Sequence, residues 1–166
     1  GTYVDAGTQQ IGSFDLVVTA LTSYTPASTA SDGCHGSFGS INVRSGHSVS
    51  LQYEFRDSST GSLVTLPRFY LSFYDIDQHS SSIRETLRVY DHESYLLWPA
   101  DADVTNANPA SKVEVTSIAG GVQFRSSAAS EQANPTDPAT LTAAQKRVSV
   151  QLLYEGRSSF VIELVV

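Results

Sequence analysis

The stretch Ser48-Val49-Ser50-Leu51-Gln52-Tyr53-Glu54-Phe55-Arg56-Asp57 alternates polar and apolar side chains from Ser48 to Arg56. Successive side chains of a β-strand point to opposite faces, so one face of this segment carries Val49, Leu51, Tyr53 and Phe55. The other face is polar. A strand with one apolar and one polar face is typical of an antiparallel sheet that buries one side only.

The same alternation recurs along the chain, between stretches rich in Ser, Thr and Gly that favour turns. Further strands are expected at Phe14–Leu21, Phe38–Arg44, Arg68–Tyr74, Ile83–Tyr90, Tyr95–Trp98, Lys112–Ile118, Gly121–Ser126, Arg147–Tyr154 and Ser158–Val166. About ten short strands of this kind predict an all-β fold, a two-sheet antiparallel β-sandwich that is jelly-roll-like. A closed barrel is the alternative architecture.

The length of the chain favours one domain. We expect residues 1–166 to form a single β-sandwich domain, because a chain of this size can bury a sizeable core without disulfides. One short helical turn is also expected, since Thr142 and Gln145 match the spacing of a capping box.

The composition is low in charge, with 16% charged residues and a net charge of −7. Such a composition, rich in Ser, Thr and Gly, is common in extracellular β domains and predicts a secreted or cell-surface protein. An acidic chain lacks the clustered Lys and Arg that nucleic acid and anionic lipid require, so neither is an expected partner. No apolar run is long enough to predict membrane insertion. The oligomeric state stays open.

The sequence offers little for catalysis. Cys34 is the only cysteine, which excludes an intrachain disulfide. Cys34 and His35 are adjacent on an extended segment and point apart, so they do not form a nucleophile–base pair. No nucleophile elbow, zinc-binding helix or phosphate loop is present. A glycosidase needs two acids flanking a cleft, and no long cleft-forming loops accompany the acidic residues. We therefore expect a non-enzyme, with no catalytic residues.

Three carboxylates stand out near the middle of the chain. Asp75 and Asp77 continue the apolar line of the strand that precedes them. If Gln78–Ser82 is a loop, Arg68–Tyr90 forms a hairpin in which Asp75 lies opposite Glu85. The three acids then converge at the rim of the apolar face, where unpaired like charges are destabilising.

Something must neutralise these carboxylates. Calcium is one candidate, because it accepts several oxygen ligands at flexible geometry. The expected metal ligands are Asp75, Asp77 and Glu85, with Asp137 from a later loop. The alternative is that the acids are structural and are paired by arginine, the candidates being Arg68, Arg84, Arg88 and Arg147.

Aromatic residues give a second indication. Tyr74, Tyr90, Tyr95 and Trp98 lie close together in sequence, and Tyr70 alternates outward from the same strand as Tyr74. Rings with a polar handle often stack against sugars, so the first four are candidate ligand-binding residues. The alternative is that these rings cover the core or plug its rim.

Two segments carry a resemblance. The run Phe73-Tyr74-Asp75-Ile76-Asp77 with Arg84-Glu85, and the run Asn134-Pro135-Thr136-Asp137-Pro138 with Leu141, Thr142 and Gln145, resemble a module of multidomain surface proteins of marine microalgae and bacteria. The resemblance spans about two-thirds of the chain. It implies an extracellular β-sandwich used for adhesion or glycan contact. It also marks Asp75, Asp77, Glu85 and Asp137 as positions of interest, without assigning them a role.

Together these patterns predict a non-catalytic extracellular binding or adhesion module, calcium-stabilised, that contacts a glycan or a surface or matrix protein. Two other functions remain. The apolar run Phe160–Val166 favours a structural or assembly subunit of a larger complex. The acidic cluster would suit a small hydrolase.

Overall fold

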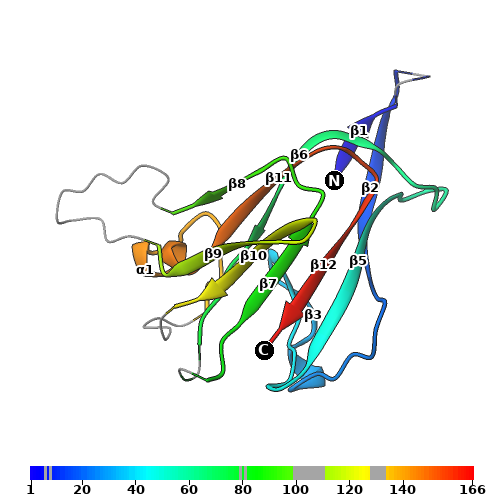
Figure 1. Ribbon diagram of the computed structural model, residues 1–166. Coiled ribbons are helices and arrows are strands. Elements are labelled where there is room, and N and C mark those ends of the chain that lie inside the picture. Colours follow the sequence, from blue (N-terminus) through cyan, green and yellow to red (C-terminus); the bar gives the residue numbers. More distant parts are fainter. Residues whose placement is uncertain (6, 8, 79, 81, 99–110, 128–133) are drawn as a thin grey trace.

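The computed structural model describes residues 1–5, 7, 9–78, 80, 82–98, 111–127 and 134–166. Its strands form two stacked antiparallel sheets and a separate two-stranded ribbon (Figure 1). The predicted all-β sandwich is confirmed.

The larger sheet has seven strands. Their order is β1 (Thr2–Val4), β2 (Ile11–Ala20), β5 (Ser48–Asp57), β12 (Ser159–Val165), β7 (Thr86–Tyr90), β10 (Gly121–Ser126) and β9 (Val113–Ile118). The smaller sheet has three strands in the order β6 (Leu66–Phe73), β11 (Val150–Arg157) and β8 (Ser94–Leu97). The ribbon pairs β3 (Gly33–His35) with β4 (Phe38–Ser40).

The connectivity from β5 onward resembles that of a jelly roll, except that β9 pairs with β10 in the large sheet and not with β8 in the small one. β5 pairs with β12, β6 with β11, and β7 with β10, while β5 through β8 alternate between the two sheets. Such a fold is a long double-stranded ribbon rolled into two layers. The predicted hairpin across Arg68–Tyr90 is therefore wrong for most of its length, because β6 and β7 lie in different sheets.

The core fills the space between the sheets. The apolar side chains of β5, Val49, Leu51, Tyr53 and Phe55, are all buried, as the alternation predicts. Phe160 of β12 packs against several aromatic rings of the core. The centre of its ring lies 5.0 Å from that of Tyr53 and 4.5 Å from that of Tyr154. β12 lies at the centre of the large sheet, and Phe160 and Ile162 of its apolar run are buried in the core.

The predicted helical turn is α1 (Ala143–Arg147). Thr142 caps it: its hydroxyl accepts from the Gln145 N–H at 3.2 Å, and the Gln145 side chain accepts from the Thr142 N–H at 2.9 Å. The strand predicted from Arg147 starts instead at Val150, because α1 continues through Arg147. A single 3₁₀ turn, η1 (Thr29–Ser31), was not predicted. Neither helix in the described residues has the length or apolarity to cross a membrane.

Candidate functional site

The acidic cluster lies in the connection from β6 to β7, where the chain crosses from the small sheet to the large one. Ile76 anchors this connection: its side chain is buried, and its N–H donates to the Val148 carbonyl at 2.8 Å. Asp75 has a positive φ of 64°, which turns the chain at the end of β6. The crossing therefore has a defined shape, with an acidic residue on each side of Ile76.

The tip of the crossing is a short antiparallel ladder. The Glu85 N–H donates to the Asp77 carbonyl at 3.0 Å, and Gln78 bridges to Arg84. Glu85 is therefore opposite Asp77, and not opposite Asp75 as the sequence predicts. The strand register that a loop at Gln78–Ser82 implies is therefore wrong by two residues. Residues 79 and 81 of that predicted loop lie outside the described part of the chain.

Burial and neighbouring negative charge raise the pKa values of Asp75 and Glu85. Burial, then the charge of Asp77, raises the pKa of Glu85 to about 7. Burial, then the charge of Asp77, raises the pKa of Asp75 to about 6. A hydrogen bond from the Asp77 N–H at 3.4 Å acts in the opposite direction on Glu85. The charges of Asp75 and Asp77 thus act on the pKa of Glu85, as the predicted convergence of the three side chains requires. Protonation is one means of neutralising the charge of this cluster.

Metal binding at this cluster stays a prediction. In the described ranges, no group of three or more His, Cys, Asp or Glu side chains is placed so that it could hold a metal ion. Three of the four arginines proposed as an alternative have acidic partners outside the cluster. Arg68 pairs with Glu155, Arg84 with Glu114 at 3.9 Å, and Arg88 with Glu163 at 3.2 Å.

Asp137, the fourth expected ligand, has a local role. Its carboxylate accepts from the Ala139 N–H at 2.9 Å, and its carbonyl accepts from the Thr140 N–H at 3.3 Å. These bonds form an Asx-type turn that leads into α1. The Asp137 side chain is exposed, and it is not among the groups that shift the pKa of Asp75 or Glu85.

The four aromatic residues predicted to bind ligand do not form one surface. Tyr95 points toward the core, with its ring 4.9 Å from that of Phe124. Tyr74 packs edge-on against Phe38 at 5.5 Å, and Tyr90 ends β7 in the large sheet. Trp98, after β8, remains exposed, and the Lys146 ammonium lies 4.6 Å from its ring centre.

The outer face of the small sheet, which points away from the large sheet, gathers a different set. Strand alternation and register place on it Arg68, Tyr70, Ser72, Ser94, Leu96, Gln151, Leu153 and Glu155. Tyr70 is 56% exposed and Leu96 is 50% exposed, and Trp98 follows Leu96 by two residues on the same strand line. The sequence pattern places Tyr70 outward, but Leu96 and Gln151 come from distant strands whose register no local pattern reveals.

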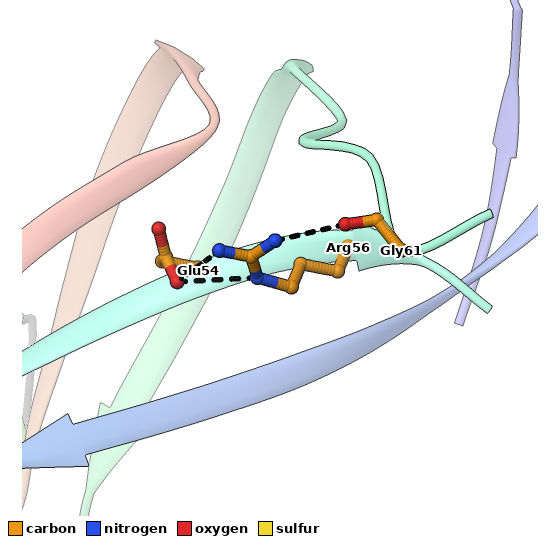
Figure 2. A network of polar contacts seen from close by, with 3 residues as sticks. All are labelled: Glu54, Arg56 and Gly61. Atoms are coloured by element: carbon orange, nitrogen blue, oxygen red, sulfur yellow. Dashed lines mark hydrogen bonds and ion pairs between the residues drawn. The ribbon is translucent and has the colours of Figure 1, made fainter.

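The outer face of the large sheet is polar by contrast. Figure 2 shows Arg56 of β5 between Glu54 and the Gly61 carbonyl; its guanidinium donates to Glu54 at 2.8 Å and to Gly61 at 2.8 Å. Arg88 is similarly satisfied by Glu163 and Gln123. In the part of the chain that the structure describes, these two arginines are paired within the sheet and do not point to a ligand.

Comparisons of the chain with protein-family models, curated proteins and solved structures found no match.

Proposed function

We propose that this protein is a non-catalytic extracellular binding module that contacts a neutral glycan through the outer face of the small sheet. The observation that carries the proposal is the exposure of Tyr70 and Leu96 on one side of a three-stranded sheet, with the exposed Trp98 directly after the end of β8. Exposed rings and a leucine on a flat surface favour stacking against the C–H faces of sugars.

Polar groups accompany these apolar ones. The Gln151 amide donates to the Ser72 hydroxyl at 3.1 Å, in the row that also holds Leu96. A ligand lying across the face would meet apolar contacts and hydrogen-bonding groups side by side, as in most small-ligand sites. From strand rise and spacing, Tyr70 and Trp98 are on the order of 16 Å apart, enough to contact several sugar units.

Charge favours a neutral ligand. Among the described strand residues of the outer face, the ionic groups are Arg68 and Glu155, which pair with each other, while the Lys146 ammonium is already engaged by the Trp98 ring. The chain as a whole carries −7, so acidic polysaccharides are repelled at low salt. The composition, low in charge and rich in hydroxyl side chains, supports a secreted or cell-surface location for such a module.

The test uses Trp98, which is the only tryptophan in the chain. Its fluorescence is titrated with cellohexaose and maltohexaose as neutral probes and with alginate as an acidic one. We expect a saturable change with a neutral probe and none with alginate. Tyr70→Ala and Leu96→Ala should each weaken binding about tenfold, the loss of about 1.4 kcal/mol typical of one stacking contact.

Leu63→Ala is the matched control, because Leu63 is 52% exposed and lies in the loop between β5 and β6. It should leave the affinity unchanged. Equal loss in all three variants, or saturation by alginate alone, contradicts the proposal.

The hydrolase alternative is distinguished in the same samples. If reducing ends appear during incubation and disappear in an Asp75→Asn, Glu85→Gln double variant, the protein is an enzyme. If binding occurs without reducing ends, the binding module stands.

A further inference from the structure

β2 is the end strand of the large sheet over most of its length (Figure 1). β1 pairs with β2 only from Ile11 to Ser13, and Gly1 extends the pairing to Phe14, whose N–H donates to the Gly1 carbonyl at 2.9 Å. Past Phe14, no strand of the described residues pairs with this side of β2. Residues Asp15–Ala20 are all exposed.

The open side has a regular hydrogen-bonding pattern. The Ser13 carbonyl accepts from Ser58 and the Leu21 N–H donates to Ser50, so odd-numbered residues of β2 turn their backbone groups toward β5. In an antiparallel ladder the next residues turn theirs the other way. Leu16, Val18 and Ala20 therefore direct their N–H and C=O groups outward from the sheet.

This edge lacks the devices that normally prevent strand addition, which are charge, proline and short length. The run Leu16–Leu21 carries no charge and no proline, and the side chains of Leu16 and Val18 are each 41% exposed. The other sheet edges each carry such a device: β9 carries Glu114, β6 carries Pro67 and Arg68, and β1 and β8 have only three and four residues.

We propose that a second copy of this chain pairs with β2 through its own β2, antiparallel and centred on Val18. In this register Val18 lies opposite Val18, and Leu16 lies opposite Ala20. All three outward-facing residues of each copy then gain backbone partners, and the two large sheets become one continuous sheet. On one face of the joined sheet, the side chain of Val18 meets Val18 of the second copy, and Leu16 meets Ala20 of the second copy. The inference is independent of the proposed function.

The dimensions of the open edge fit a second β2. One end is closed by β1, and at the other end the chain bends at Leu21 and Thr22. A second copy supplies a strand of the same length, and it bends away at its own Leu21 before it reaches β1. Self-pairing about a two-fold axis is also the commonest symmetry of homo-oligomers.

Charge permits this pairing. Asp15 lies opposite Leu21 of the second copy, so the two Asp15 carboxylates are about 20 Å apart, six residues at about 3.3 Å each. That exceeds the screening length of about 8 Å at physiological salt. The two copies still repel through their net charge of −7, so association should strengthen as salt is added.

Cysteine cross-linking tests the register. Exposed Cys34 is first replaced by serine. In that background Val18→Cys places two thiols on directly opposed residues, about 5.5 Å apart between Cα atoms, which is within disulfide range. Leu16→Cys is the matched control, because its two copies are about 14 Å apart. Rapid oxidation to a dimer with Val18→Cys but not with Leu16→Cys supports the proposal. Equal cross-linking of both variants, or of neither, contradicts it.

Sedimentation equilibrium of the unmodified chain tests the association itself. We expect the average mass to rise toward twice the monomer value with concentration and with added salt. Val18→Lys, and independently Val18→Pro, should keep the chain monomeric, since the Val18 N–H is not used within the sheet. Leu63→Lys should dimerise like the unmodified chain. A monomer at every concentration and salt level overturns the proposal.

Discussion

Asp77 and Glu85 are joined by two hydrogen bonds that run in opposite directions. The Glu85 N–H donates to the Asp77 carbonyl at 3.0 Å, and the Asp77 N–H donates to the Glu85 carboxylate at 3.4 Å. The second bond turns the Glu85 carboxylate back toward the connection, where burial opposes its charge. An acidic cluster held in this way makes stability depend on pH.

The direction of that dependence follows from the raised pKa values. Glu85 and Asp75 have folded pKa values of about 7 and about 6, above their ordinary values of 4.5 and 3.8. Between these limits the folded state binds more protons than the unfolded state, so stability falls as pH rises from about 4 to about 7. Above about pH 7 this contribution is flat.

Glu85→Gln should therefore stabilise the protein at pH 8. The expected gain is at most on the order of 3 kcal/mol, because the folded pKa of about 7 lies above the ordinary value of 4.5. The measurement is urea unfolding at pH 5 and pH 8, with exposed Glu93→Gln as the control variant. A Glu85→Gln variant that is less stable than the parent at pH 8 would show that the charged carboxylate has a favourable partner.

If the cluster of Asp75, Asp77 and Glu85 binds calcium, the ion should stabilise the protein. At pH 8 a bound calcium ion should raise the free energy of unfolding by about 2.7 kcal/mol at one hundred times its Kd. The increase should disappear in an Asp77→Asn, Glu85→Gln double variant. The measurement is the melting temperature in calcium, in magnesium and in EGTA. Equal values in calcium and EGTA would rule out the metal.

The aromatic core makes a separate prediction. The hydroxyls of Tyr53 and Tyr154 are buried and have no hydrogen-bond partner among the described residues. Burial raises the pKa of both phenols. Because an unsatisfied buried hydroxyl is unfavourable, Tyr154→Phe should leave stability unchanged or raise it by about 1 kcal/mol.

Tyr24→Phe is the matched control, since the Tyr24 hydroxyl donates to Asp32 at 2.6 Å. It should lower stability by about 1 kcal/mol. The comparison is made by urea unfolding of the two variants under one condition. A large loss in Tyr154→Phe would indicate that a buried water satisfies the hydroxyl.

The sequence predicted the sandwich because alternation is a local property of each strand. The segments 48–57 and 121–126 were predicted with the bounds that the structure has. The predicted pairing of the strands within Arg68–Tyr90 was wrong, because the true partners are distant in sequence. The pairing of β6 with β11 joins Phe69 to Tyr154, a long-range contact that no local pattern encodes. The Arg68–Tyr90 hairpin was the simplest local alternative.

The candidate sites show the same limit. The meeting of Asp77 and Glu85 was predictable because a tight ladder joins residues close in sequence. The outer face of the small sheet was not, since Tyr70 and Leu96 belong to strands separated by β11. Tyr95 was assigned to a ligand surface although it packs on Phe124, because only the stacking of the sheets shows which side of β8 faces the core.

The most direct test of the proposed function is to map where a neutral glycan contacts the protein. Backbone amide shifts are followed by NMR while cellohexaose or maltohexaose is added. We expect the largest changes in β6, β8 and β11, around Tyr70, Leu96 and Gln151, with saturation that matches the Trp98 fluorescence. Changes confined to the large sheet, or to the crossing at Asp75–Glu85, would contradict the proposal that the small sheet carries the binding face.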